Sequence, residues 1–178
     1  MMERGHSHEG VGHVVVPGTF DPITFGHLDV IERACRLFTH VTIAVASSQG
    51  KNGVGTTFSL DERVDMCAEA VAARGLDGCV DVRPFEGLLV DFCHEVCAGA
   101  VVKGLRAMTD FEYELQQAEL NARMAPDIES VFVMSGSEYG FVSSSIVREL
   151  ASLGSDVSFL VPPNVDTALK ERFAPATP

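Results

Sequence analysis

Short runs of apolar, largely β-branched residues recur along this chain and predict strands. They occupy residues 14–16, 41–46, 80–83, 100–102 and 131–134. Most of these runs are apolar at successive positions, which is typical of strands that a parallel sheet buries on both faces. We therefore expect a five-stranded, mostly parallel sheet.

Between the strands, apolar residues recur at helical spacing. The clearest case follows His27, where Leu28, Ile31 and Cys35 share one face. A capping box, S-x-x-E at residues 59–62, opens the next helix. Further helices are predicted at residues 87–97, 109–124, 143–149 and 168–173. Because alternating strands and helices imply right-handed crossovers, the sequence predicts an α/β, Rossmann-like doubly wound sheet with helices on both faces.

The loop of residues 17–27 joins the first strand to the first helix and predicts an anion-binding site. Gly18 and Gly26 lack a Cβ, so a phosphate can approach the backbone closely. Thr19 adds a hydroxyl donor, and His27 falls in the first helical turn, where its ring can reach a ligand. The alternative is that these residues are ordinary turn and cap signals.

Two basic residues, Lys103 and Arg106, follow the fourth predicted strand. In a doubly wound sheet the first and fourth strands flank the switch point, where ligands bind. We therefore expect Lys103 and Arg106 to face the same crevice as the loop of residues 17–27. The alternative is that they are solvated basic residues at the end of a strand.

Length and composition favour one domain. The chain has 178 residues, of which 46% are hydrophobic, and this suits a single core. We expect one domain at residues 13–178, preceded by a flexible extension at residues 1–12. No apolar run approaches the roughly 18 residues of a membrane span, and the His-rich start lacks the apolar core of a signal peptide. The sequence thus predicts a cytoplasmic protein without a membrane partner.

Charge and cysteine usage exclude other classes of protein. The formal net charge of −12 disfavours nucleic-acid binding, which needs a broad basic face. The five cysteines are odd in number and lie in apolar segments, as reduced thiols do, rather than in a secreted disulfide framework.

Two His-containing segments raise the question of a metal. Cys93, His94 and Cys97 are close in sequence, but no second ligand pair follows at the spacing of a zinc site. A second group, His6, His8 and His13, is interpreted as part of a flexible tail or an expression remnant. We expect no metal held by the protein itself.

The full string of the loop, P-G-T-F-D-P-I-T-F-G-H, resembles the signature of phosphopantetheine adenylyltransferase, a family of the nucleotidyltransferase superfamily. The family's T-x-G-H motif corresponds to residues 24–27, with Phe25 at the variable position. Further matches, in family order, are K-G-L-R at residues 103–106, D-F-E-Y-E at residues 110–114 and S-S-S-I-V-R at residues 143–148. The resemblance extends over roughly residues 14–173. It implies transfer of the adenylyl group of ATP to 4'-phosphopantetheine, giving dephospho-coenzyme A and pyrophosphate.

The resemblance also implies roles for individual residues. The catalytic residues would be His27, Lys51 and Arg106. The ATP contacts would be Thr19, Phe20, His27, Gly104, Leu105, Arg106, Glu114, Tyr139, Ser143, Ser144 and Ser145. The acceptor contacts would be Thr19, Lys51, Leu89 and Lys103.

Cofactor and partners follow from the same resemblance. Mg²⁺ would arrive with ATP rather than in a protein cage, the protein would form a homohexamer, and coenzyme A is a possible feedback ligand. One alternative is another adenylyl- or cytidylyltransferase, acting on nicotinamide mononucleotide or on a sugar or polyol phosphate. The other is a nucleotide-binding regulatory domain without turnover. Release of pyrophosphate over time would distinguish an enzyme from a binding domain.

Overall fold

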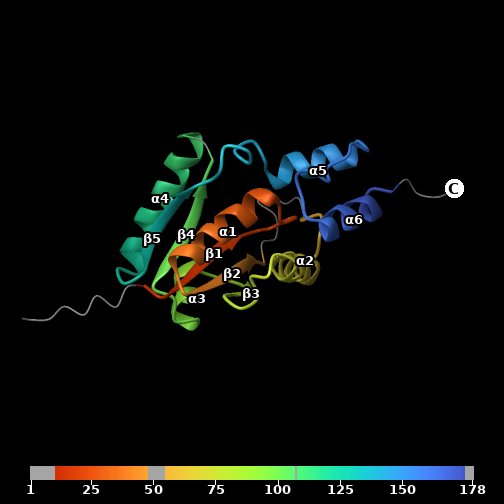
Figure 1. The fold of residues 1–178 in the computed structure, drawn as a ribbon. Helices are drawn as coiled ribbons and strands as arrows, with labels where there is room; N and C mark the ends of the chain where they lie inside the picture. Colours follow the sequence, from red (N-terminus) through yellow and green to blue (C-terminus); the bar gives the residue numbers. More distant parts are fainter. Residues whose placement is uncertain (1–10, 48–54, 107, 175–178) are drawn as a thin grey trace, which may run out of the picture.

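The computed structural model describes residues 11–47, 55–106 and 108–174. Its strands form one sheet in the order β3-β2-β1-β4-β5, with every neighbouring pair parallel (Figure 1). They are β1 (His13–Gly18), β2 (His40–Ala46), β3 (Val80–Phe85), β4 (Ala100–Leu105) and β5 (Glu129–Met134). The predicted α/β fold with a five-stranded parallel sheet is confirmed.

The described helices are α1 (Phe25–Leu37), α2 (Leu60–Ala73), α3 (Leu89–Glu95), α4 (Met108–Met124), α5 (Ser144–Ser152) and α6 (Pro163–Arg172). Helix α3 is shorter than predicted because Gly87 and Cys97 have positive φ angles of 84° and 57°, which a right-handed helix excludes. Helix α6 begins earlier than predicted, with Pro163 in its first turn, where the missing N–H costs nothing.

The sheet separates two hydrophobic clusters. In β1 the side chains alternate: Val14 and Val16 enter the larger cluster, with residues of α1, α2, α5 and α6, while Val15 enters the smaller one, with residues of α3. This alternation is the period-2 geometry of a strand. Helices therefore cover both faces of the sheet, as predicted.

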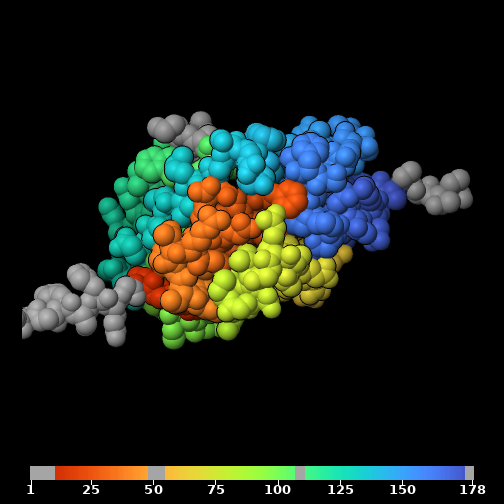
Figure 2. Space-filling model, viewed as in Figure 1, coloured from red at the N-terminus to blue at the C-terminus, as the bar shows by residue number. Residues whose placement is uncertain are grey.

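The direction of strand succession reverses between β1 and β4. From β1 the chain proceeds outward through β2 to β3, then returns to β4 on the other side of β1 and continues to β5. The carboxyl ends of β1 and β4 therefore flank a switch point, where open α/β sheets bind ligands. Figure 2 shows the C-terminal segment of the chain, in blue, against the N-terminal part, in orange. The backbone N–H of Phe25, in α1, donates to the carbonyl of Leu160 at 2.9 Å.

Among the described residues, the helices are too short or too polar to cross a membrane.

Candidate active site

A cavity of about 480 Å³ opens at the switch point, beyond the carboxyl ends of β1 and β4. Most of the predicted site residues line it: Thr19, Phe20, His27, Lys103, Gly104, Arg106, Glu114, Ser143, Ser144 and Ser145. The prediction that the loop of residues 17–27 and the end of the fourth strand face one crevice is confirmed. A second cavity, of about 520 Å³, lies between α5 and α6 and includes none of these residues.

Three other predicted residues lie outside the lining of this cavity. Leu105 ends β4 and is buried. The Tyr139 ring packs against that of Phe25, with centroids 6.3 Å apart. Leu89 begins α3 and packs against the smaller cluster. One more predicted residue, Lys51, lies outside the described residues.

His27 is oriented by the start of its own helix. Thr24 is the N-cap of α1, and its backbone N–H donates to Nδ1 of His27 at 3.1 Å. Because Nδ1 accepts this hydrogen bond, the proton of the neutral ring belongs on Nε2. Burial, and to a lesser extent the charge of Arg106, lowers the pKa of His27 to about 4. At neutral pH His27 is therefore an uncharged donor.

The ring of Phe20 supports this arrangement. Phe20 is buried, has a φ of +48°, and its ring meets that of His27 edge to face, with centroids 5.1 Å apart. The same ring lies over Gly18, where an added Cβ would come within 3.0 Å of it. Gly18 therefore serves to let the loop fold back over the end of β1.

The loop is braced by parts of the chain that sequence reasoning did not associate with it. The carboxylate of Asp21 accepts from the backbone N–H groups of Thr57 and Phe58, both at 2.9 Å. Arg148, in α5, pairs with the same carboxylate at 3.5 Å and also donates to the Asp21 carbonyl. The hydroxyl of Ser144 donates to the carbonyl of Pro22 at 2.8 Å. The motif at residues 143–148 therefore holds the loop as well as lining the cavity.

Arg63 is a second support that sequence reasoning missed. Its side chain, 2% exposed, donates to the carbonyls of Thr19 at 2.6 Å, Ala46 at 2.9 Å and Phe58 at 3.2 Å. It thus joins α2 to the loop and to the end of β2. A charged residue on the apolar face of a predicted helix was the signal in the sequence.

The polar wall of the cavity carries paired charges. Lys103 Nζ lies 3.4 Å from Glu114 Oε2, and that oxygen is buried without a hydrogen-bond partner. Arg106 donates to the carbonyl of Val142 at 3.0 Å. Two basic side chains facing one cavity suit an anionic ligand, although the whole chain is acidic.

Gly104 allows β4 to approach α1. A Cβ at this position would lie 2.5 Å from Cγ2 of Val30, which packed side chains do not tolerate. The backbone between Lys103 and Arg106 can therefore lie against the first helix.

The first turn of α5 closes the cavity. Ser143 is the N-cap and accepts from the N–H of Ile146 at 3.2 Å, and Ser143, Ser144 and Ser145 all line the cavity. A helix N-terminus presents backbone N–H groups and a positive dipole end to anions. The N-terminal turns of α1 and α5 both contribute to this cavity.

Cys93 and His94, from the other segment considered for a metal, have different surroundings in the described structure. Cys93 is buried in the smaller cluster, while His94 pairs with Asp127 at 2.9 Å. In the described residues, the one group of three candidate ligands is His13, His40 and Asp81. The structure places His13 in β1 rather than in a tail.

Two helix N-termini, two basic side chains and a neutral histidine donor meet at the switch point of an α/β sheet, an arrangement that suits the phosphate groups of a ligand. Residues 15–150 match the family model described as cytidylyltransferase-like. The chain belongs to this family, within the nucleotidyltransferase superfamily.

Solved structures of other proteins share the fold. One is a bifunctional NMN adenylyltransferase/ADP ribose pyrophosphatase from Francisella tularensis, complexed with AMP and a manganese ion, with a TM-score of 0.65 and 18% identity over 91% of this chain. The match covers 50% of that protein, so the present chain spans about half its length.

Two further structures extend the comparison. A putative nicotinate-nucleotide adenylyltransferase from Vibrio parahaemolyticus has a TM-score of 0.63 and 14% identity, covering 92% of this chain and 96% of that one. A lipopolysaccharide core biosynthesis protein from Thermoplasma volcanium has a TM-score of 0.53 and 18% identity, covering 72% of this chain and 100% of that one. At identities of 14–18%, the similarity to these structures shows a shared fold alone.

Proposed function

We propose that this protein transfers the adenylyl group of ATP to 4'-phosphopantetheine, giving dephospho-coenzyme A and pyrophosphate. The observation that carries the proposal is the convergence of sequence motifs on one cavity. The loop of residues 17–27, the end of β4, Glu114 of α4 and the start of α5 are far apart in sequence, yet all contribute lining residues. Each belongs to a motif that resembles the phosphopantetheine adenylyltransferase family.

In the proposed reaction an oxygen of the acceptor phosphate attacks the α-phosphorus of ATP. A bond forms between them, the bond from the α-phosphorus to the α,β-bridging oxygen breaks, and pyrophosphate leaves with the electron pair. The acceptor phosphate is already ionised near neutral pH, so the protein needs no general base. Alignment of the two phosphates and stabilisation of the developing charge carry the catalysis.

The described residues suit these tasks. His27 would donate from Nε2 to an oxygen of the α-phosphate, because Nδ1 is already occupied by Thr24. Lys103 and Thr19 would bind the acceptor phosphate. Arg106 and the N-terminal turn of α5 would bind the β- and γ-phosphates.

Lys51 and magnesium complete the proposal. Lys51 would contribute a further cation to the acceptor phosphate, as the resemblance implies. Glu114 is the one carboxylate among the described lining residues, and it is paired with Lys103. Mg²⁺ prefers to keep several waters and to bind through substrate phosphates, so MgATP is the substrate that fits this lining. Assembly as a homohexamer and feedback by coenzyme A are proposed on the resemblance alone.

A second candidate is adenylyl transfer to a nicotinamide or nicotinate mononucleotide. The observation that favours it is the similarity of fold to an NMN adenylyltransferase and to a putative nicotinate-nucleotide adenylyltransferase. Both candidates share the attacking phosphate, so they differ only in how the remainder of the acceptor binds.

Pyrophosphate release with a panel of acceptors tests the proposal. With MgATP, we expect rapid release of pyrophosphate with 4'-phosphopantetheine and little with nicotinamide mononucleotide, nicotinate mononucleotide or glycerol phosphate. CTP with choline phosphate tests for cytidylyl transfer, and we expect little pyrophosphate from this pair. Faster release with a pyridine mononucleotide would favour the second candidate. ATP binding without pyrophosphate release from any acceptor would support a regulatory binding domain instead.

A further inference from the structure

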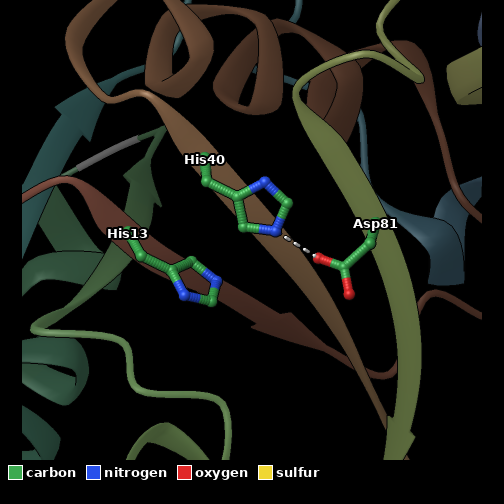
Figure 3. Close-up of side chains that lie close together, drawn as sticks. All are labelled: His13, His40 and Asp81. Atoms are coloured by element: carbon green, nitrogen blue, oxygen red, sulfur yellow. Dashed lines mark ion pairs between the residues drawn. The ribbon is translucent and has the colours of Figure 1, made fainter.

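A cluster of potential metal ligands lies at the end of the sheet opposite the cavity. His13 is the first residue of β1, His40 is the first residue of β2, and Asp81 is the second residue of β3 (Figure 3). His13 and His40 are register partners, and Asp81 is the partner of Thr42. Since residues two apart share a face of a strand, all three side chains project from the same face of three adjacent strands.

The side chains are already close to coordinating geometry. His40 Nε2 lies 3.0 Å from Asp81 Oδ1, and the three residues offer ligand atoms that all lie within 4.8 Å of one another. Tetrahedral zinc with bonds of about 2.0–2.2 Å places its ligand atoms about 3.3 Å apart. No pair of these ligand atoms therefore needs to approach by more than about 1.5 Å for zinc to bind.

Hydrogen bonds around the cluster orient its carboxylate. The hydroxyl of Thr42 is 2.8 Å from His13 Nε2 and donates to Asp81 Oδ1 at 2.6 Å. Arg83 Nε donates to Asp81 Oδ2 at 2.6 Å. Oδ1, which also lies 3.0 Å from His40 Nε2, is therefore the carboxylate oxygen on the side of the imidazoles. Outer contacts of this kind fix ligand orientation in metal sites, although the charge of Arg83 opposes a cation.

We propose that His13, His40 and Asp81 bind one divalent transition metal ion of the zinc class, with water in the remaining position. Two imidazoles and one carboxylate are ligands that zinc and its neighbours accept, whereas Mg²⁺ and Ca²⁺ require mostly oxygen ligands. The site lies about 16 Å along β1 from the loop after Gly18, at 3.3 Å per residue. The ion would therefore link the amino ends of β1, β2 and β3 and stabilise the sheet without entering the reaction.

Calorimetric titration with Zn²⁺ tests this site. The background carries His6→Ala and His8→Ala, so that these two histidines contribute no signal. We expect one equivalent to bind, and His40→Gln or Asp81→Asn to weaken binding at least about tenfold, since even outer contacts of metal sites are worth about 10- to 100-fold. His94→Gln is the matched control, because His94 also pairs with an aspartate, Asp127, at 2.9 Å but belongs to no group of three candidate ligands among the described residues. It should leave the affinity unchanged.

Two further readouts do not depend on enzymatic activity. At a free Zn²⁺ concentration of about 100 Kd, the Tm of the background protein should rise by about 5–10 °C, and that of His40→Gln should not. One equivalent of Zn²⁺ should also shift the ring ¹⁵N resonances of His13 and His40 in the background protein. This measurement leaves all three proposed ligands unsubstituted. Absence of one-equivalent binding, or binding that survives both His40→Gln and Asp81→Asn, would overturn the proposal.

Discussion

The protonation state of His27 is fixed by its surroundings before any substrate arrives. The backbone N–H of Thr24 occupies Nδ1, and the ring of Phe20 packs against the imidazole. Burial and the nearby Arg106 keep the ring neutral by lowering its pKa to about 4. A neutral donor can stabilise charge that develops on a phosphate without attracting the ground-state anion strongly, so its effect belongs mainly to the transition state.

We predict that His27→Ala lowers kcat by about a hundredfold or more while ATP affinity stays within a few-fold. A donor used mainly in the transition state contributes roughly 2.7–4 kcal/mol. Steady-state kinetics and calorimetric ATP binding on the folded variant measure the two effects separately. His94→Ala is the control, because His94 is exposed and is not among the residues that line the cavity. A kcat near that of the wild type would remove His27 from the chemistry.

At the scale of elements, α2 supports the loop of residues 17–27. Its buried Arg63 donates to three carbonyls, from the loop, from β2 and from the segment before α2. These carbonyls would lose their donors if Arg63 were replaced by an apolar residue, and unsatisfied buried polar groups are costly.

We predict that Arg63→Met lowers the free energy of unfolding by about 2 kcal/mol or more, since its bond to Phe58 is buried, the other two bonds are partly buried, and an orphaned buried acceptor costs about 1–3 kcal/mol. Arg74→Met is the matched control, because Arg74 caps the same helix and pairs with Glu32 at 2.6 Å on the surface. Such exposed pairs are worth at most about 1 kcal/mol. Urea unfolding measures both variants, and equal losses would contradict a supporting role for Arg63.

The helices and strands were largely predictable because burial gives each of them a recognisable pattern of apolar residues in the sequence. The strand at residues 41–46 is apolar at almost every position, as burial on both faces requires, and the capping box of Ser59 and Glu62 forms as predicted. The boundaries of α3 were wrong because they depend on the positive φ of Gly87 and Cys97. A left-handed cysteine has no signature in an apolar run.

At the scale of the whole molecule, the sequence predicts those parts of the cavity that come from motifs at strand ends. It does not predict contacts between side chains that are distant in sequence. The topology alone brings the loop after β1 beside Lys103. The pairing of Asp21 with Arg148, two residues 127 apart in sequence, leaves no local pattern. The same holds for His13, His40 and Asp81, which meet only because β1, β2 and β3 pair in this register.

The stability of the molecule should depend on pH through His27. Its pKa in the folded protein is about 4 against an ordinary value of 6.5. Above pH 6.5 both folded and unfolded chains hold a neutral ring, so His27 contributes nothing to the pH dependence. Between pH 6.5 and 4 the unfolded chain takes up a proton that the folded chain does not. The free energy of unfolding therefore decreases as the pH is lowered through this range.

We predict a loss of up to about 3 kcal/mol between pH 6.5 and 4 from this residue. The free energy of unfolding in urea, measured at intervals over this range, should fall less steeply in His27→Gln than in the wild type. Burial also lowers the pKa of His13, which is retained in both proteins, so the difference between the two slopes isolates His27. Identical slopes would contradict the lowered pKa.

The contacts by which α5 holds the loop of residues 17–27 have a consequence for the order in which this protein acquires function. Asp21 and Pro22 are held by Arg148 and Ser144, which lie more than 120 residues further along the chain. During synthesis the loop and β1 emerge first, but the partners that hold the loop are translated only after β5. A nascent chain that stops before α5 would have the glycines and the histidine of the loop without the side chains that fix them, so nucleotide binding should begin late in translation.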